Sequence, residues 1–108
     1  MSAEQYDAVD IIRAQRDGRA ITEGEIRWLV DAYTRGYVMD AQMSAFTMAV
    51  LLNGLGRDQI RVLTDAMIAS GERMDFGSLG KVTVDKHSTG GVGDKITLPL
   101  APLVAAFG

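Results

Sequence analysis

The sequence of 108 residues contains no cysteine, a single histidine and no long apolar run. Without cysteine the chain forms neither disulfides nor thiolate metal sites, which is compatible with a reducing compartment. The longest apolar segment, residues 45–52, is interrupted by Thr47 and ends at Asn53, well short of the roughly 20 residues that span a bilayer. The polar, acidic N-terminus is unlike a signal peptide. These absences predict a cytoplasmic protein that does not enter a membrane.

Positive charge is scattered along the chain and forms no stripe. Eleven basic residues face fourteen acidic ones, which leaves a net charge of −3 at pH 7 and a pI near 5.0. The sequence therefore offers no electrostatic reason to bind nucleic acid. A hydrophobic content of 47% and a charged content of 23% are typical of a globular protein.

The first two thirds of the chain is predicted to form helices, because apolar residues recur at helical spacing and glycines follow the periodic segments. The second helix is expected to begin at a capping box, with a hydroxyl three residues before a carboxylate. The expected helices cover residues 6–14, a segment from the capping box of Thr22 and Glu25 to Gly36, residues 41–52 behind a cap at Asp40, and residues 57–70.

The third of these helices has almost no polar face. A helix that is apolar all round is expected to be buried on all sides. Either it lies at the centre of a self-contained four-helix core, or a second subunit covers it. The methionines at positions 39, 43, 48, 67 and 74 are expected to fill the core.

Residues 82–97 read V-T-V-D-K-H-S-T-G-G-V-G-D-K-I-T and predict an anion site. The β-branched run 82–84 predicts a strand, and the apolar residues 98–107 predict a helix or a buried run. Between them, loop N–H groups converge and a helix N-terminus adds about half a positive charge. Lys86 contributes a full charge, and the sequence therefore predicts a phosphate site. Its remaining side-chain donors are the hydroxyls of Ser88, Thr89 and Thr97.

Two common phosphate motifs do not fit this loop. In a P-loop, lysine follows glycine directly, whereas Asp94 separates Gly93 from Lys95. A dinucleotide fingerprint would require glycine or alanine where Ile96 stands. ATP and NAD are therefore not the expected ligands. What distinguishes the loop is His87 beside the glycines, although by pattern alone it is as consistent with a surface residue.

The run D-K-H-S-T-G-G-V-G-D, followed by L-x-L-x-P-x-V-A-A, resembles the phosphate loop of the thymidine phosphorylase and pyrimidine-nucleoside phosphorylase family. The similarity extends to D-x-I-x-x-x-R-D-G, Q-M-S-A-F and S-G-E-R-M-D in the first part of the chain. It implies phosphorolysis of thymidine, or of uridine or deoxyuridine, to the free base and (deoxy)ribose 1-phosphate in nucleoside salvage. Inorganic phosphate would be the co-substrate, and no organic cofactor is implied.

The resemblance also implies roles for individual residues. Lys86, Ser88 and Thr97 would contact phosphate, and His87 would donate a hydrogen bond to the carbonyl oxygen of the leaving pyrimidine. The backbone carbonyls of Gly93 and Lys95 would bind potassium. By contrast, Asp85 and Asp94 are expected to stabilise the loop. Family members pair through their helical domains, so a homodimer is expected.

The expected fold is an N-terminal all-α domain over residues 1–70, a glycine-rich linker or hinge over residues 71–81, and the first strand–loop–helix unit of a mixed α/β domain over residues 82–108. Because the strand has no evident sheet partner, the chain is expected to be a truncated fragment. The resemblance implies that the base-binding residues lie outside it, so the fragment is expected to be inactive alone. Two alternatives stay open: a phosphoribosyltransferase of the anthranilate type, similar only in the glycines, and a non-catalytic helical dimerisation module.

Overall fold

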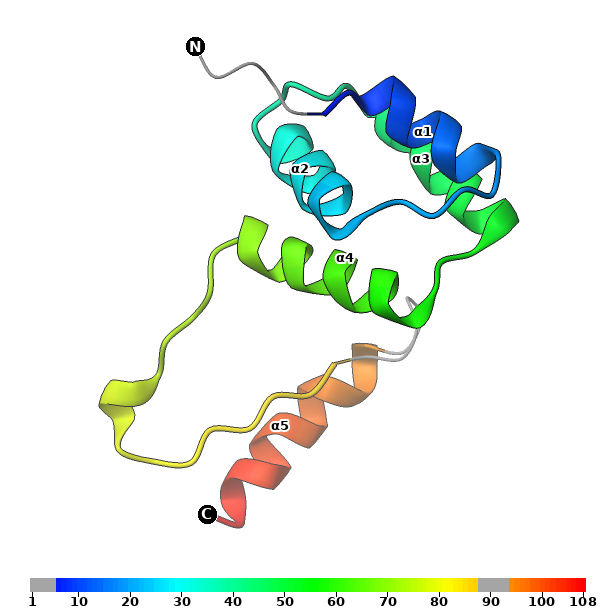
Figure 1. Ribbon diagram of the computed structural model, residues 1–108. Coiled ribbons are helices and arrows are strands. Elements are labelled where there is room, and N and C mark those ends of the chain that lie inside the picture. The colour runs from blue at the N-terminus through cyan, green and yellow to red at the C-terminus, as the bar shows by residue number, and fades with distance from the viewer. Residues whose placement is uncertain (1–5, 88–93) are drawn as a thin grey trace. The chain divides into compact units, whose positions relative to one another are not determined.

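The computed structural model describes residues 6–87 and 94–108. The chain divides into two compact units, Met1–Arg73 and Met74–Gly108. No helix in the described part of the chain is long and apolar enough to cross a membrane. The first unit holds α1 (Ala8–Arg16), α2 (Glu23–Thr34), α3 (Asp40–Asn53) and α4 (Arg57–Ser70), and the second holds the short 3-10 helices η1 (Gly77–Leu79) and η2 (Asp94–Ile96) and the helix α5 (Thr97–Ala106) (Figure 1).

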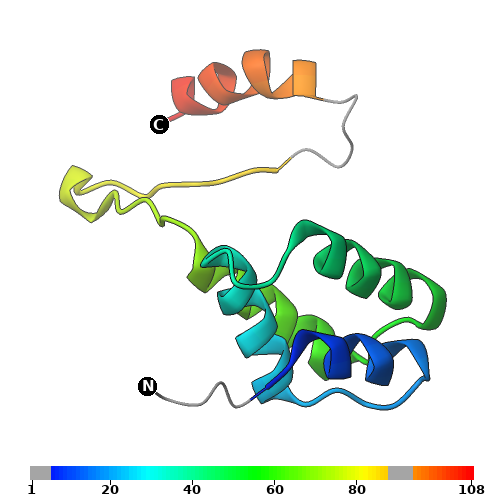
Figure 2. The same cartoon turned by 90° about the horizontal axis from the view of Figure 1, so that it is seen from above.

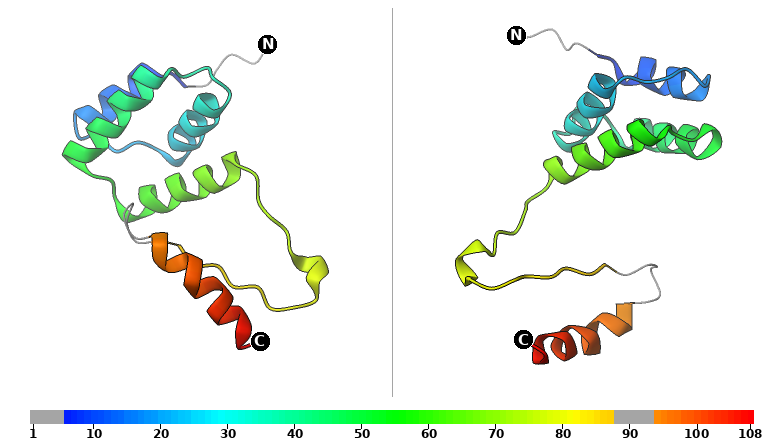
Figure 3. Two further views of the ribbon diagram at one scale, coloured as in Figure 1. Left: turned by 180° about the vertical axis from the view of Figure 1, so that it is seen from behind. Right: turned by 60° about the horizontal axis from the view of Figure 1, so that its bottom comes forward.

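The helical unit is built from two helix pairs, α1 against α3 and α2 against α4 (Figures 1 and 3). The side chains of Ile11, Ile26 and Leu29 lie between these pairs and are each only 1% exposed. Full burial of one such aliphatic side chain contributes about 1.5–3 kcal/mol. Phe46 of α3 and Val62 of α4 complete the same apolar cluster. The prediction of a helical first domain is therefore confirmed.

The ends of these helices follow from local hydrogen bonds. α1 begins two residues later than predicted because the Asp7 side chain caps it, accepting from the backbone N–H of Val9 at 2.7 Å. The predicted capping box of α2 is confirmed: the Thr22 hydroxyl accepts from the Glu25 N–H at 3.2 Å, and the Glu25 carboxylate accepts from the Thr22 N–H at 2.7 Å. α4 has the predicted bounds.

The predicted cap of α3 is wrong by one residue. Met39 occupies the N-cap position, and the Gln42 side chain accepts from its backbone N–H at 3.0 Å. Asp40 is instead the first helical residue, and its carboxylate accepts a hydrogen bond from the Tyr33 hydroxyl at 3.0 Å. Asp40 thus ties the start of α3 to the end of α2.

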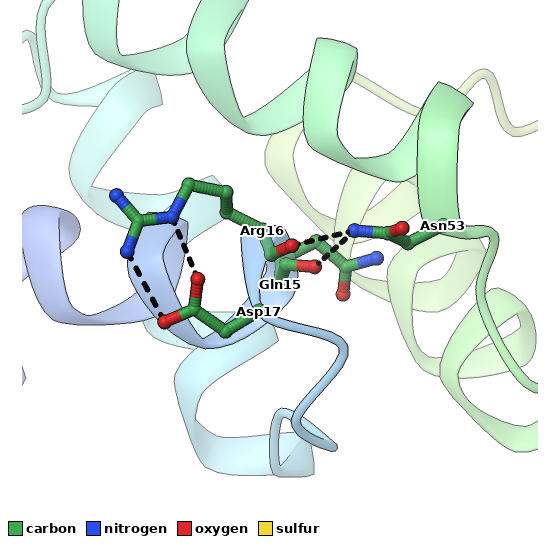
Figure 4. A network of polar contacts seen from close by, with 4 residues as sticks. All are labelled: Gln15, Arg16, Asp17 and Asn53. Carbon is green, nitrogen blue, oxygen red and sulfur yellow. Dashed lines mark hydrogen bonds and ion pairs between the residues drawn. The ribbon is translucent and has the colours of Figure 1, made fainter.

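Side-chain amides join the end of α1 to the end of α3 (Figure 4). Gln15 is only 4% exposed, and its Nε2 donates to the Gly54 carbonyl at 2.7 Å. In the opposite direction, Nδ2 of Asn53 donates to the carbonyls of Gln15 at 2.9 Å and Arg16 at 2.8 Å. These bonds satisfy carbonyl groups that a helix end leaves without partners.

An ion pair lies beside this amide contact. The Arg16 Nε donates to the Asp17 carboxylate at 2.7 Å (Figure 4). That hydrogen bond lowers the pKa of Asp17 and raises the pKa of Arg16. Both side chains are solvent-exposed, so the pair contributes little to stability.

The expectation that α3 is buried on all sides is wrong for the single chain. Phe46 and Ala49 are buried, whereas Met48, Leu51 and Leu52 are 55%, 76% and 74% exposed. The reason is the pairwise packing, which places the main contact of α3 on α1 and leaves its opposite face uncovered. The expectation for the methionines is also wrong for most of them, because those at positions 39, 48, 67 and 74 are exposed.

The second unit contains the predicted helix but not the predicted strand. α5 covers Thr97–Ala106, close to the expected residues 98–107. Residues 82–87 are neither helix nor strand, and the described residues include no strand at all. A strand is defined by a ladder of hydrogen bonds to a neighbour, and the described chain offers these residues none. Val82 and Val84 are accordingly 93% and 80% exposed on an extended segment (Figure 2).

Candidate anion site

The two ends of the predicted phosphate loop meet through their side chains. The Nζ of Lys86 donates a hydrogen bond to Oγ1 of Thr97 at 3.0 Å, although eleven residues separate them in the chain. Lys86 lies on the extended segment after Val84, and Thr97 is the first residue of α5. This position of Thr97 puts the Lys86 ammonium close to the start of α5, which the 3-10 helix η2 precedes directly.

A groove of about 400 Å³ lies next to this contact within the second unit. Asp85 lines the groove, and its carboxylate accepts from the backbone N–H of Lys86 at 2.8 Å. The groove thus has a polar end and an apolar wall supplied by the extended segment and α5. Its lining residues with polar side chains are Asp85, Lys86 and Thr97, and its main apolar ones are Val82, Val84, Leu100 and Val104.

The polar end carries groups that suit an oxyanion. Lys86 supplies a compact positive charge with three donors. Thr97 supplies a hydroxyl whose own proton can be donated to an anion. Lys86 is exposed and Thr97 half-buried, so an incoming anion can reach both. The described contact therefore brings together two of the three side chains that the resemblance assigned to phosphate.

The other predicted site residues are described only in part. His87 follows Lys86 directly, and its side chain is exposed. Lys95 lies in η2 and is exposed. Ser88 and Gly93 lie outside the described residues, as does Thr89. The roles proposed for these residues, including potassium binding by the carbonyls of Gly93 and Lys95, stay predictions.

Asp85 is the group whose place the sequence reasoning missed. It was expected to stabilise the loop, and its hydrogen bond to Lys86 N agrees with that role. The structure also places Asp85 among the residues that line the groove of Lys86 and Thr97. The available signal was its position, since Asp85 directly precedes Lys86 in the chain. Among the described residues, no cluster of three or more metal-ligating side chains occurs.

A second cavity of about 400 Å³ lies in the helical unit, between the loop after α1 and the loop before α4. The amide side chains of Gln15, Asn53 and Gln59 line it together with Arg19. Gln15, Asn53 and Gln59 already donate to backbone carbonyls. Their hydrogen bonds account for the polarity of this cavity without a ligand.

The sequence profile of the glycosyl transferase family's helical bundle domain matches residues 9–71. The chain belongs to this family. The matched residues cover α1 to α4, so the family assignment rests on the unit whose packing is described above.

Curated relatives extend the similarity over both units. The chain is 56% identical over 103 residues to the thymidine phosphorylase of Mycobacterium tuberculosis, which covers 95% of the chain and 24% of the relative. It is 47% identical over 100 residues to the pyrimidine-nucleoside phosphorylase of Geobacillus stearothermophilus, covering 93% of the chain and 23% of the relative. The predicted resemblance is thereby confirmed. The chain spans about a quarter of the length of these relatives.

Proposed function

We propose that the protein carrying this chain is a pyrimidine-nucleoside phosphorylase that cleaves thymidine with inorganic phosphate. The products are the free base and deoxyribose 1-phosphate. The two relatives are named for this chemistry, and the chain belongs to a glycosyl transferase family. The proposal extends to uridine and deoxyuridine, to a role in nucleoside salvage, and to a cytoplasmic location.

The observation that carries the proposal is the hydrogen bond from Lys86 Nζ to Thr97 Oγ1. It brings a charge and a hydroxyl from opposite ends of the glycine-rich segment to one end of a groove. A tetrahedral oxyanion needs several donors converging from different directions, which one end of the loop alone cannot supply. Phosphate bound at this end of the groove would be held for its role as the attacking co-substrate.

In the proposed reaction an oxygen of hydrogen phosphate forms a bond to the anomeric carbon of the sugar while the bond to the pyrimidine nitrogen breaks. The electron pair of that bond leaves with the base, which takes up the proton released by the phosphate. Lys86, Thr97 and Ser88 hold the phosphate in place, so the attack becomes effectively unimolecular. His87 donates to the carbonyl oxygen of the base, where negative charge develops.

The proposal includes a homodimer in which α3 meets a second copy. Its support is the row of exposed apolar side chains on α3, Met48, Leu51 and Leu52. Contiguous apolar surface of this kind marks an interaction site more often than isolated exposed residues do. A two-fold axis would let the same face of α3 in each copy cover the other.

Potassium bound by the carbonyls of Gly93 and Lys95 also belongs to the proposal.

The test is an assay of the purified protein with thymidine and phosphate, in which release of thymine is followed by its absorbance. We expect thymine and an equal amount of deoxyribose 1-phosphate, both dependent on added phosphate. Replacing phosphate by pyrophosphate and magnesium tests the phosphoribosyltransferase alternative. Release of thymine without any phosphate dependence would contradict the proposal.

A further inference from the structure

One feature of the groove conflicts with a simple anion site. Asp85 lines it together with Lys86 and Thr97, and it is the one residue with a carboxylate side chain among the described lining residues. One carboxylate oxygen, Oδ1, accepts from the backbone N–H of Lys86 at 2.8 Å. The other oxygen, Oδ2, is a second acceptor on the same side chain.

A carboxylate beside a bound oxyanion is unfavourable unless the anion brings a proton. Two like charges in one site repel, and at this exposed site water weakens the repulsion without removing it. Hydrogen phosphate carries an O–H group at neutral pH, which can donate to Oδ2 and convert the repulsion into a charge-assisted hydrogen bond. Sulfate has the same tetrahedral shape and the same charge of about −2, but it has no proton to donate.

The other polar side chains of the groove do not distinguish these two anions. The Lys86 ammonium is a donor only, and the Thr97 hydroxyl can donate to an oxygen of either anion. An acceptor that cannot become a donor is needed to recognise the proton. Among the described lining residues, Asp85 alone has that character.

We propose that Asp85 is a specificity-determining residue that makes the groove select an oxyanion retaining a proton, such as hydrogen phosphate or hydrogen arsenate, against sulfate. This inference rests on the proposed function, because it assigns the selectivity of the same phosphate site. It gives Asp85 a role toward the ligand in addition to its hydrogen bond with the Lys86 backbone.

The test compares Asp85→Asn with the wild-type protein and with a matched control, Asp75→Asn. Asp75 lies in the same unit, and its carboxylate likewise accepts a backbone N–H, that of Gly77 at 2.8 Å, but it is not among the residues lining the groove. The measured quantity is the sulfate inhibition constant divided by the KM for phosphate. In Asp85→Asn we expect this ratio to fall by about tenfold or more, the range of one charged hydrogen bond.

The Asp75→Asn ratio is expected to equal that of the wild-type protein, and Asp85→Glu, which keeps the carboxylate, is expected to retain selectivity. Hydrogen arsenate also carries a proton, so its KM is expected to change in the same direction as the KM for phosphate in every variant. If circular dichroism shows that Asp85→Asn does not fold, the ratio of the sulfate inhibition constant to the KM for phosphate is measured in Asp85→Ser instead.

An unchanged ratio in a folded, active Asp85 variant would overturn the inference, as would a fall of the same size in Asp75→Asn. Failure of the proposed function has a different signature, because the wild-type protein would then show no phosphate-dependent cleavage of thymidine at all. The two failures are therefore distinguished within one set of assays.

Discussion

The ammonium of Lys86 and the hydroxyl of Thr97 are hydrogen-bonded at 3.0 Å across the ends of the glycine-rich segment. This hydrogen bond directs both side chains toward the same place. Preorganised donors bind an anion with less loss of conformational freedom than donors that must first be ordered. Thr97 therefore has a positioning role for Lys86 as well as a binding role.

This arrangement predicts the effect of changing Thr97. Thr97→Val keeps the shape of the side chain but removes the hydroxyl, whereas Thr97→Ser keeps the hydroxyl. We expect Thr97→Val to raise the KM for phosphate by a factor of about 2 to 10, the equivalent of about 0.5–1.5 kcal/mol for one hydrogen bond. Thr97→Ser should stay close to the wild-type value. Equal KM values in all three proteins would show that the hydroxyl has no part in binding.

Gln15 is predicted to stabilise the helical unit. Its buried Nε2 donates to the Gly54 carbonyl at 2.7 Å, and Gln15→Leu would leave that carbonyl without its partner. We expect the free energy of unfolding to fall by about 0.5–1.5 kcal/mol, the net contribution of one hydrogen bond. Urea denaturation followed by circular dichroism measures the change. Glu72→Gln, at an exposed position after α4, is the control, and a loss as large in the control would contradict the assignment.

Tyr33 is predicted to hold its proton to unusually high pH. The hydrogen bond to the Asp40 carboxylate, followed by the negative charge of Asp40, raises the pKa of Tyr33. Because the folded-state pKa is raised, the stabilisation is fully present below the unfolded value of about 10 and is lost as the pH rises through the folded value. An NMR titration of the Tyr33 ring carbon bound to oxygen measures it directly. In Asp40→Asn the pKa should fall, and an unchanged value would contradict the stated cause.

The exposed face of α3 is predicted to be a subunit contact. Leu51 is 76% exposed, so Leu51→Glu should leave the single chain folded while placing two charges in a two-fold interface. We expect light scattering to show a dimer for the wild-type protein and a monomer for Leu51→Glu. Arg57→Glu, at the start of α4, is the matched surface control. A wild-type protein that is monomeric at every concentration would rule out the dimer.

The sequence predicted most of the helical unit correctly because its signals are local. The capping box of Thr22 and Glu25 and the apolar spacing of α4 each depend on residues within a few positions of one another. The shift of α1 has an equally local cause, the Asp7 cap, which the apolar spacing alone does not reveal. Element types were therefore predicted more reliably than their ends.

Two errors arose where the outcome depends on distant neighbours. Val82 and Val84 have strand-forming side chains, but pairing requires a second strand, which the described chain lacks. The apolar composition of α3 indicated burial, but Leu51 and Leu52 have nothing to cover them in a single chain. Composition shows that a surface is apolar and does not show what packs against it.

The candidate site was predictable in part. Lys86 and Thr97 were assigned together from the resemblance, and their hydrogen bond places them side by side. The position of Asp85 in the same groove was missed, because the pattern gives no direction for a side chain in an irregular segment. Ser88 lies outside the described residues, so its role stays a prediction.

The most direct test of the central claim is the dependence of thymidine cleavage on phosphate concentration in Lys86→Ala. Lys81→Ala is the matched control, because Lys81 is an exposed lysine of the same unit that is not among the residues lining the groove. We expect Lys86→Ala to raise the KM for phosphate by roughly tenfold or more, since a hydrogen bond to a charged group contributes about 1.5–3 kcal/mol. The Lys81→Ala protein should match the wild type. A phosphate dependence in Lys86→Ala that is indistinguishable from the wild type would contradict the phosphate site, and with it the proposed mechanism.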